Sequence, residues 1–246
     1  MTRLFLFGVS GRMGNMIIDC ASQGNEAIVV GGFDKVASPK VPTFSSIDDI
    51  DCEFDVIVDF SLPVLLDEVI ALAKKSGKGV VFATTGYTAE QEEKIKALSA
   101  TVPVLRSGNM SLGVNLLLDL VEKATKALAD GFDIEIIEKH HNQKVDAPSG
   151  TAKMLADSVK SVKTDAKYLY GREGASKREK EDVTIHAVRG GTIVGEHEVI
   201  FAGNDEIITL SHTALSRKIF ANGAIRASIF LKDKANGYYT MKNALQ

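Results

Sequence analysis

The stretch LFLFGVSGRMGNMII, residues 4–18, decides the fold of the first half of the chain. Its apolar start predicts a short strand at 4–7, and an apolar stripe farther on predicts a helix over 12–22. Glycines between them let the backbone approach a pyrophosphate closely, while the helix N-terminus offers unpaired N–H groups. The spacing is G-x-x-G-x-x-G, with serine where the common dinucleotide pattern has its second glycine. The stretch predicts a dinucleotide cradle with contacts from Gly8, Ser10, Gly11, Arg12 and Met13.

An acidic residue follows at the distance expected of such a cradle. The run AIVVGGF predicts a strand over 27–33, and Asp34 comes directly after it. A carboxylate there accepts hydrogen bonds from ribose hydroxyls and favours NADH, because it repels a 2′-phosphate. Lys35 comes next and could attract that phosphate, although it could equally be a solvated surface lysine. Together the two residues predict tolerance of both NADH and NADPH.

Strands and helices continue to alternate through the first hundred residues. Further strands are expected at 55–60, 79–84 and 102–106, with helices at 63–76 and 89–100. This alternation predicts a parallel sheet wound with crossover helices, that is, a Rossmann-like nucleotide-binding domain. Small and polar residues after its strands lie where an open α/β sheet binds its ligand, although ordinary loop composition is the alternative. The expected cofactor contacts there are Ala83, Thr84, Thr85, Ser107, Asn109 and Met110.

After about residue 110 the pattern changes to that of a second, α+β domain with an open mixed sheet. Helices are expected at 112–128, 151–162 and 216–232. Alternation of apolar and polar residues marks the expected strands, one face of which must be covered by helices or by another subunit. The charged run 172–182 is expected to be a solvated loop, with a substrate-facing lid as the alternative. The strands are expected at 132–141, 183–190, 192–203 and 205–214, with an edge strand at 237–241.

Composition narrows the classes of function. The chain has 246 residues, about the length of two domains. A net charge of −3 gives no general attraction for nucleic acid or for an anionic membrane surface. No run approaches ~18 consecutive apolar residues, and the N-terminal apolar run is too short for a signal peptide, so no membrane association is expected. Cys20 and Cys52 lie in different segments without metal spacing, which favours a reduced, cytoplasmic setting.

A second motif, EIIEKHHNQKVDAPSGTA at 135–152, crowds proton-active side chains just ahead of a helix. His140 and His141 would point to opposite faces of a strand, so both can serve one small site only if the strand ends or bends between them. Lys144 lies just beyond, where it can converge with one histidine. The helix then opens with Ser149, Gly150 and Thr151, whose N–H groups and hydroxyl form an anion site. These features suit a small acidic substrate that needs a proton when hydride arrives.

Other interpretations of this motif compete. The histidines could bind a metal with Glu138 or Asp146, but adjacent histidines lack the i, i+4 spacing of helical zinc sites, and no metal is expected. Ser149 could act as a helix N-cap, which does not exclude anion binding. Lys144 could be a solvated charge. Three later histidines lie in strand-like runs and are interpreted as structural or surface residues: His186, His197 and His212.

The motif resembles the signature of the 4-hydroxy-tetrahydrodipicolinate reductase (dihydrodipicolinate reductase) family of bacterial lysine biosynthesis. Asn142 and Gln143 depart from relatives that carry basic or imidazole side chains there, which could alter substrate affinity. The resemblance covers nearly the whole chain. Its other matching segments are GVSGRMG at 8–14, TTG at 84–86, NMSLGVN at 109–115, RGGTIVGEH at 189–197 and SRKIFANGA at 216–224.

The resemblance implies the NAD(P)H-dependent reduction of a cyclic, nitrogen-containing dicarboxylate in the diaminopimelate and lysine pathway. In that reaction 4-hydroxy-tetrahydrodipicolinate loses water, hydride reaches C4 of the conjugated imine, and a proton must be supplied. His140 would be the proton donor, and Lys144 the partner that polarises or protonates the product enamine. The implied substrate-binding residues are His141, Ser149, Gly150 and Thr151.

The resemblance also implies a domain arrangement. Residues 1–109 and 217–246 would form the dinucleotide-binding domain, and 110–216 the domain for substrate binding and tetramerisation. The protein would be a homotetramer whose second domains meet through their sheets.

Two other classes of protein share part of these features. A different nicotinamide oxidoreductase of amino-acid metabolism, such as a homoserine or aspartate-type dehydrogenase, would share the glycine turn without needing the histidine–lysine motif. A non-enzymatic sensor of NAD(H) would need no proton donors.

Overall fold

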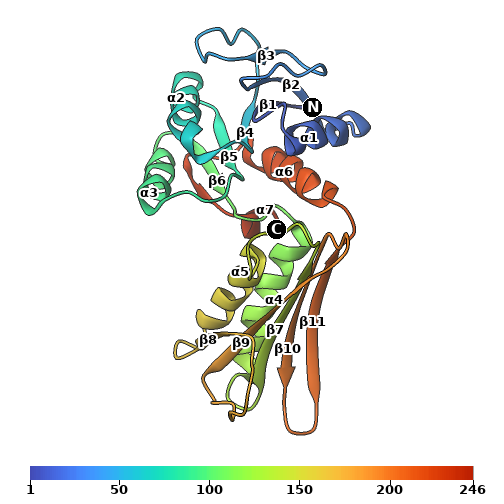
Figure 1. Cartoon of the computed structure of the whole chain (residues 1–246). Helices are drawn as coiled ribbons and strands as arrows, with labels where there is room; N and C mark the ends of the chain where they lie inside the picture. The colour runs from blue at the N-terminus through green and yellow to red at the C-terminus, as the bar shows by residue number, and fades with distance from the viewer. Residues whose placement is uncertain (246) are drawn as a thin grey trace. The chain divides into compact units, whose positions relative to one another are not determined.

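The computed structural model describes residues 1–245, and the chain divides into two compact units. The first unit contains Met1–Leu112 and Lys218–Gln246, and the second contains Gly113–Arg217. The chain therefore leaves the first unit and returns to it with its last long helix (Figure 1). Residue 246, the last of the expected nucleotide domain, lies outside the described residues.

The first unit is built on a seven-stranded sheet in the order β12-β6-β5-β4-β1-β2-β3, and every pairing in it is parallel. Chain order reverses between β1 and β4, which creates the switch point where open α/β sheets bind ligands. The predicted Rossmann-like domain is confirmed. The edge strand expected at 237–241 is present as β12, but it ends at Tyr239 and belongs to this first sheet, because it pairs with β6. The strands are β1 (Thr2–Phe7), β2 (Ala27–Phe33), β3 (Thr43–Phe44), β4 (Val56–Asp59), β5 (Gly79–Phe82), β6 (Pro103–Arg106) and β12 (Gly237–Tyr239).

Helices cover both faces of this sheet (Figure 1). On β1, Leu4 and Leu6 belong to the core shared with α1 and α6, whereas Phe5 and Phe7 belong to the core shared with α2 and α3. Strands buried on both faces form near-continuous apolar runs, which is why LFLF predicts a strand. The helices are α1 (Arg12–Gln23), the 3-10 turn η1 (Pro63–Leu65), α2 (Leu66–Ser76), α3 (Ala89–Leu98), α6 (Lys218–Leu231) and α7 (Met241–Ala244).

The second unit is a five-stranded mixed sheet in the order β11-β10-β7-β9-β8, with α4 and α5 packed on one face (Figure 1). Along β7, Ile134 and Ile136 enter that packed core, and the period of two places Glu138 and His140 on the same face. The predicted open mixed sheet is confirmed. The elements are α4 (Leu112–Leu128), β7 (Asp133–His140), α5 (Gly150–Lys160), β8 (Lys167–Tyr170), β9 (Asp182–Arg189), β10 (Gly195–Ala202) and β11 (Ile207–Ala214). Among residues 1–245, no helix is long and apolar enough to cross a membrane.

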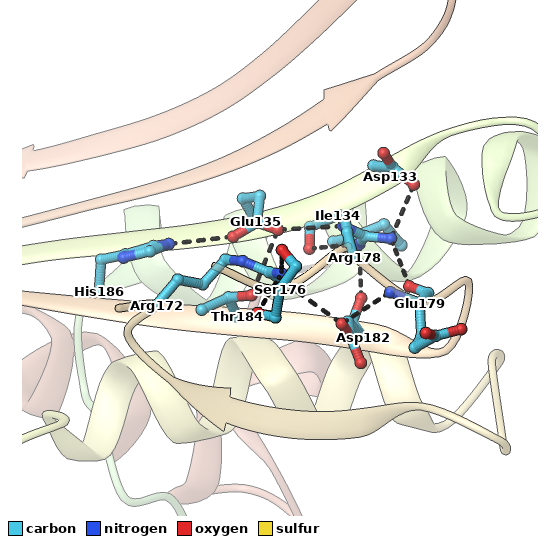
Figure 2. Close-up of polar contacts among 10 residues, drawn as sticks. All are labelled: Asp133, Ile134, Glu135, Arg172, Ser176, Arg178, Glu179, Asp182, Thr184 and His186. Atoms are coloured by element: carbon cyan, nitrogen blue, oxygen red, sulfur yellow. Dashed lines mark hydrogen bonds and ion pairs between the residues drawn. The ribbon is translucent and has the colours of Figure 1, made fainter. Parts of the chain in front are cut away.

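Two arginines hold the charged loop between β8 and β9 to the sheet: Arg172 donates to the carboxylate of Asp182 at 3.3 Å, and Arg178 reaches β7 (Figure 2). Arg178 donates to the carboxylates of Asp133 at 2.7 Å and Glu135 at 3.2 Å, both on β7. It also donates to the carbonyl oxygens of Ile134 at 3.4 Å and Asp182 at 2.5 Å. Only 19% of the Arg178 side chain is exposed. The expected loop is present, but its central cation is anchored rather than solvated.

We expect Arg178→Ala to release this loop. The free energy of unfolding should fall by about 1–3 kcal/mol, because charge-assisted hydrogen bonds are lost and Glu135 loses a cation. Amide hydrogen exchange should accelerate across residues 172–181, since local opening becomes easier. Lys177→Ala changes an exposed neighbouring cation and should alter neither quantity. Equal amide exchange rates across residues 172–181 in the two variants would show that Arg178 does not hold this loop to the sheet.

Candidate active site

The glycine turn of the first unit joins β1 to α1 at the switch point of the sheet. Gly8 has a φ of +78°, and a Cβ there would lie 2.7 Å from the carbonyl oxygen of Phe60. At Gly14, a Cβ would lie 2.4 Å from the carbonyl oxygen of Gly8. Helix, turn and the end of β4 therefore pack more closely than side chains allow. Helix α1 begins after Gly11 without a side-chain cap, and Arg12 is its first residue, as suits an anion-binding helix start.

Asp34 lies against this turn. Its carboxylate accepts a hydrogen bond from the N–H of Ser10 at 3.1 Å and another from the N–H of Lys35 at 2.8 Å. The Ser10 hydroxyl donates to the carbonyl oxygen of Val36. The structure thus brings Ser10 and Asp34 together across distant parts of the sequence, while Lys35 is exposed beside them.

A pocket of about 270 Å³ opens in the first unit, and its mostly apolar walls suit a flat ring. Two residues expected to contact the cofactor, Thr84 and Ser107, are buried and do not line this pocket. Thr84 is 4% exposed, and its hydroxyl donates to the carbonyl oxygen of Asp59 at 3.4 Å. The Ser107 hydroxyl donates to the carbonyl oxygen of Asn109 at 2.7 Å. The pocket is lined by Met13, Phe60, Ala83, Thr85, Gly108, Asn109, Met110 and Phe220.

Sequence reasoning missed the aromatic walls Phe60 and Phe220 and the buried acid beside them. Asp59 ends β4 with no exposed surface, and it accepts hydrogen bonds from the Tyr87 hydroxyl at 2.5 Å and the Ser61 N–H at 3.0 Å. Burial, reinforced by Asp59, raises the pKa of Tyr87, so its hydroxyl remains a donor. This bond ties the turn after β5 to the end of β4. The feature of the sequence that could have identified Asp59 is its place at the end of an apolar strand next to the switch point.

In the second unit, β7 ends at His140, whose side chain lies on the packed face of the sheet. His140 is 8% exposed, and its Nδ1 lies 2.6 Å from Oε2 of Glu138. His141 follows the last strand residue, so the strand ends between the two histidines, as a shared site would require. His141 is half-buried, and its Nδ1 has no hydrogen-bond partner within the described chain.

Glu138 forms an ion pair rather than a metal ligand set. Both terminal nitrogens of Arg189 lie 2.7 Å from its carboxylate oxygens, one to each. The N–H of Ser149 donates to the same carboxylate at 2.9 Å. Within residues 1–245, no group of three or more histidine, cysteine or acidic side chains is arranged to hold a metal ion.

Lys144 lies on the loop between β7 and α5. Its ammonium is 2.8 Å from Oδ1 of Asp146, and 21% of its side chain is exposed, so it is not a freely solvated charge. This contact lowers the pKa of Asp146. The charge of Lys144 also acts on the imidazole of His140, so the two groups lie within electrostatic reach of each other. The structure therefore gathers both expected proton donors in one cluster.

Helix α5 opens beside this cluster. Ser149 is its N-cap and accepts a hydrogen bond from the N–H of Ala152 at 3.1 Å. The same hydroxyl lies 2.9 Å from Nε2 of His197, and Ser149 is only 2% exposed. Its hydroxyl thus has two partners, and the capping role is present. Gly150, the first helical residue, is exposed, and Thr151 follows half-buried.

The three later histidines divide between the two faces of the sheet. His197 is 5% exposed, and its ring packs edge-on against that of His140, with centroids 5.1 Å apart. Burial lowers the pKa of His197 to about 4, so it is neutral at pH 7. Its interpretation as a merely structural or surface residue missed this contact. His186 lies on the other face, 3.0 Å from Oε2 of Glu135 (Figure 2), and His212 pairs with His197 across β10 and β11.

Both parts of the chain match models of one protein family. Residues 2–110 match the N-terminus of dihydrodipicolinate reductase, and residues 113–245 match its C-terminus. The chain is 49% identical, over 100% of its length and 99% of the relative's, to the 4-hydroxy-tetrahydrodipicolinate reductase of Clostridium novyi (strain NT). It is 46% identical, over 98% of its length and 96% of the relative's, to that of Clostridium tetani (strain Massachusetts / E88).

A solved structure shows the same likeness over the full fold. The dipicolinate-bound dihydrodipicolinate reductase from Paenisporosarcina sp. TG-14 matches with a TM-score of 0.82 at 25% identity, over 98% of this chain and 97% of that one. The resemblance inferred from the sequence motifs is confirmed. The chain belongs to the dihydrodipicolinate reductase family of oxidoreductases.

Proposed function

We propose that this protein reduces 4-hydroxy-tetrahydrodipicolinate to tetrahydrodipicolinate, with loss of water and with NADH or NADPH, in diaminopimelate and lysine biosynthesis. Family membership makes the protein an oxidoreductase of this kind. The observation that carries the proposal is the cluster ahead of α5, where a buried imidazole and a half-buried amine lie in the segment that leads into the helix N-terminus.

The first unit fits a nicotinamide dinucleotide. The close packing at Gly8 leaves room for backbone only, as a pyrophosphate cradle requires, and the carboxylate of Asp34 lies beside it for the ribose. Phe60 and Thr85 line the ring-sized pocket that would take the nicotinamide. When bound, this cofactor supplies a hydride, and the protein supplies binding and orientation.

The second unit fits a dicarboxylate that must be protonated. His140 would give a proton to the reduced ring, and Lys144 would polarise or protonate the enamine as negative charge moves towards the ring nitrogen. The N–H of Gly150, an exposed residue at the start of α5, would bind one carboxylate, with Thr151 and His141 beside it. Ser149 would serve indirectly, by capping the helix that presents those groups.

We also propose a homotetramer, located in the cytoplasm, that meets through the open face of the second unit's sheet and binds neither nucleic acid nor membrane. Among the described residues, α4 and α5 cover only one face of that sheet. The other face carries the half-buried residues Ile137 and Ile200, and β11 adds the exposed Ile207 to it. A sheet face that helices leave uncovered, and that carries apolar side chains among paired polar ones, suits contact with another copy.

The reaction can be tested by reconstitution. Pyruvate, aspartate semialdehyde and the upstream synthase would generate the substrate, and addition of this protein should cause NAD(P)H absorbance to fall. The protein without the synthase, and the synthase without the protein, are the controls. No cofactor consumption in the complete mixture would refute the proposed function.

We predict that His140→Gln and Lys144→Ala each lower turnover by about 10²–10⁴-fold, because each removes a positioned proton donor. Affinity for NADH, measured by fluorescence titration, should be unchanged, since neither residue belongs to the first unit. His186→Gln is the matched control, because His186 lies on the other face of the sheet. Near-normal turnover in either test variant would show that its assigned role is wrong.

We predict that Asp34→Ala weakens NADH binding by about 10-fold more than NADPH binding, because the 2′-hydroxyl loses a charged acceptor. Both cofactors should lose some affinity, since Asp34 also holds the Ser10 N–H. The informative quantity is therefore the ratio of the two dissociation constants. Asp48→Ala, on an acid whose side chain is 84% exposed, is the control. Equal losses for both cofactors would argue against a ribose contact.

A further inference from the structure

The carboxylate of Glu138 is buried, with none of its side chain exposed, and is surrounded by N–H donors. Oε2 lies 2.6 Å from Nδ1 of His140 and 2.7 Å from Nη1 of Arg189. Oε1 accepts from Nη2 of Arg189 at 2.7 Å and from the N–H of Ser149 at 2.9 Å. Four donors on two oxygens use the full acceptor capacity of an ionised carboxylate.

These contacts settle which nitrogen of His140 carries the hydrogen. Burial alone would raise the pKa of Glu138, but hydrogen bonds from Arg189, His140 and Ser149 outweigh it and lower that pKa. Glu138 is therefore ionised and has no proton to donate. The hydrogen of the 2.6 Å contact must lie on Nδ1, and Nε2 is left as the nitrogen that gains and gives a proton.

The ring is also fixed in position. Strand register places Arg189 directly opposite His140 across β9 and β7, and His197 directly opposite Glu138 across β10 and β7. A Cβ at Gly195 would lie 3.1 Å from Nε2 of His140, so a side chain there would crowd the ring. Together with the edge-on ring of His197, these contacts hold the imidazole in one orientation.

The titratable and charged groups around His140 come from several elements: Glu138 on β7, Arg189 on β9, His197 on β10, and Lys144 and Asp146 on the loop before α5. Burial lowers the pKa of His140, Glu138 raises it, and Lys144 and Arg189 lower it. Arg189 thus opposes the effect of the carboxylate on the imidazole. Without that guanidinium, an unscreened buried carboxylate would hold the proton on the ring.

We propose that Glu138 and Arg189 form a positioning pair for His140. Glu138 fixes the hydrogen on Nδ1 and directs Nε2 to exchange a proton with the substrate. Arg189 neutralises Glu138 so that the imidazolium can give that proton up. Arg189 also donates to the carbonyl oxygen of Asp146 at 2.7 Å, which ties the pair to the loop that carries Lys144. The catalytic part of this inference rests on the proposed function, because it takes His140 as the proton donor.

The test is ¹⁵N NMR of the His140 imidazole, assigned by the loss of its signals in His140→Gln. In the unmodified protein above the pKa of His140, we expect the hydrogen on Nδ1. In Glu138→Gln the pKa of His140 should fall, and in Arg189→Gln it should rise, each by about one unit or more. Turnover should fall about 10-fold or more in both variants, and the acid limb of its pH profile should move in opposite directions. A merely structural ion pair would lower turnover in both without moving this pKa.

Glu135→Gln is the matched control for the NMR measurement. Glu135 lies on the same strand but on the other face, where it likewise contacts an arginine, Arg178 at 3.2 Å, and a histidine, His186 at 3.0 Å (Figure 2). The Glu135→Gln variant also removes one carboxylate charge, and it should leave the pKa of His140 unchanged.

Two outcomes would overturn the inference. A hydrogen on Nε2 in the unmodified protein would do so even if a variant failed to fold, and so would shifts of the His140 pKa in the same direction in both variants. Normal turnover of His140→Gln would instead overturn the proposed proton donor. Glu138 and Arg189 would then have no role in catalysis through His140. The NMR result would still report whether they fix the hydrogen on Nδ1 of that ring.

Discussion

A β-strand must alternate its side chains between two faces, and on β7 this constraint sets the character of the second unit. Ile134 and Ile136 determine which face of β7 packs beneath the helices. Because side chains alternate along the strand, Glu138 and His140 are buried on that same face. A buried charge is tolerated only when it is paired and hydrogen-bonded. The bidentate contact of Arg189 and the cap residue Ser149 follow from that requirement. The polar cluster is therefore an extension of the hydrophobic core rather than an addition to its surface.

The first unit meets a different constraint, that of backbone approach. Gly8 and Gly14 leave no space for a side chain between turn, helix and the end of β4, and the apolar pocket opens next to this tightly packed point. Asp59 and Tyr87 fix the neighbouring turn through a buried hydrogen bond. The first unit would thus bind a flexible cofactor through the close fit of its backbone and pocket. The second unit instead positions charged side chains, Glu138 and Arg189 among them. The two requirements are met by separate sheets, each with its own core.

Much of this arrangement could be predicted from local patterns. Residues 4–7 and 27–33 were recognisable as strands because burial on both faces leaves uninterrupted apolar runs, and Gly8, Gly11 and Gly14 mark the turn between strand and helix. The two-residue β3 was missed because Thr43–Phe44 is too brief to show a period. The edge strand β8 was missed because Lys167–Tyr170 has no buried residue and so lacks the apolar run that marks β4 and β5. His197 and Arg189 were missed as neighbours of His140 for another reason. Their proximity depends on strand register between segments far apart in the chain, and no local pattern encodes it.

The discontinuity of the first unit has a consequence for synthesis of the chain. Its core includes Ala221, Ala224 and Leu231 of α6, and its sheet is completed at one edge by β12. Both elements leave the ribosome after the second unit. The nascent chain therefore carries an incomplete nucleotide domain, with an apolar sheet face and an unpaired edge at β6, for the whole time in which residues 113–217 are made. Such surfaces are prone to aggregation until they are covered. Early release or truncation of the chain would therefore leave an aggregation-prone fragment rather than a folded nucleotide domain.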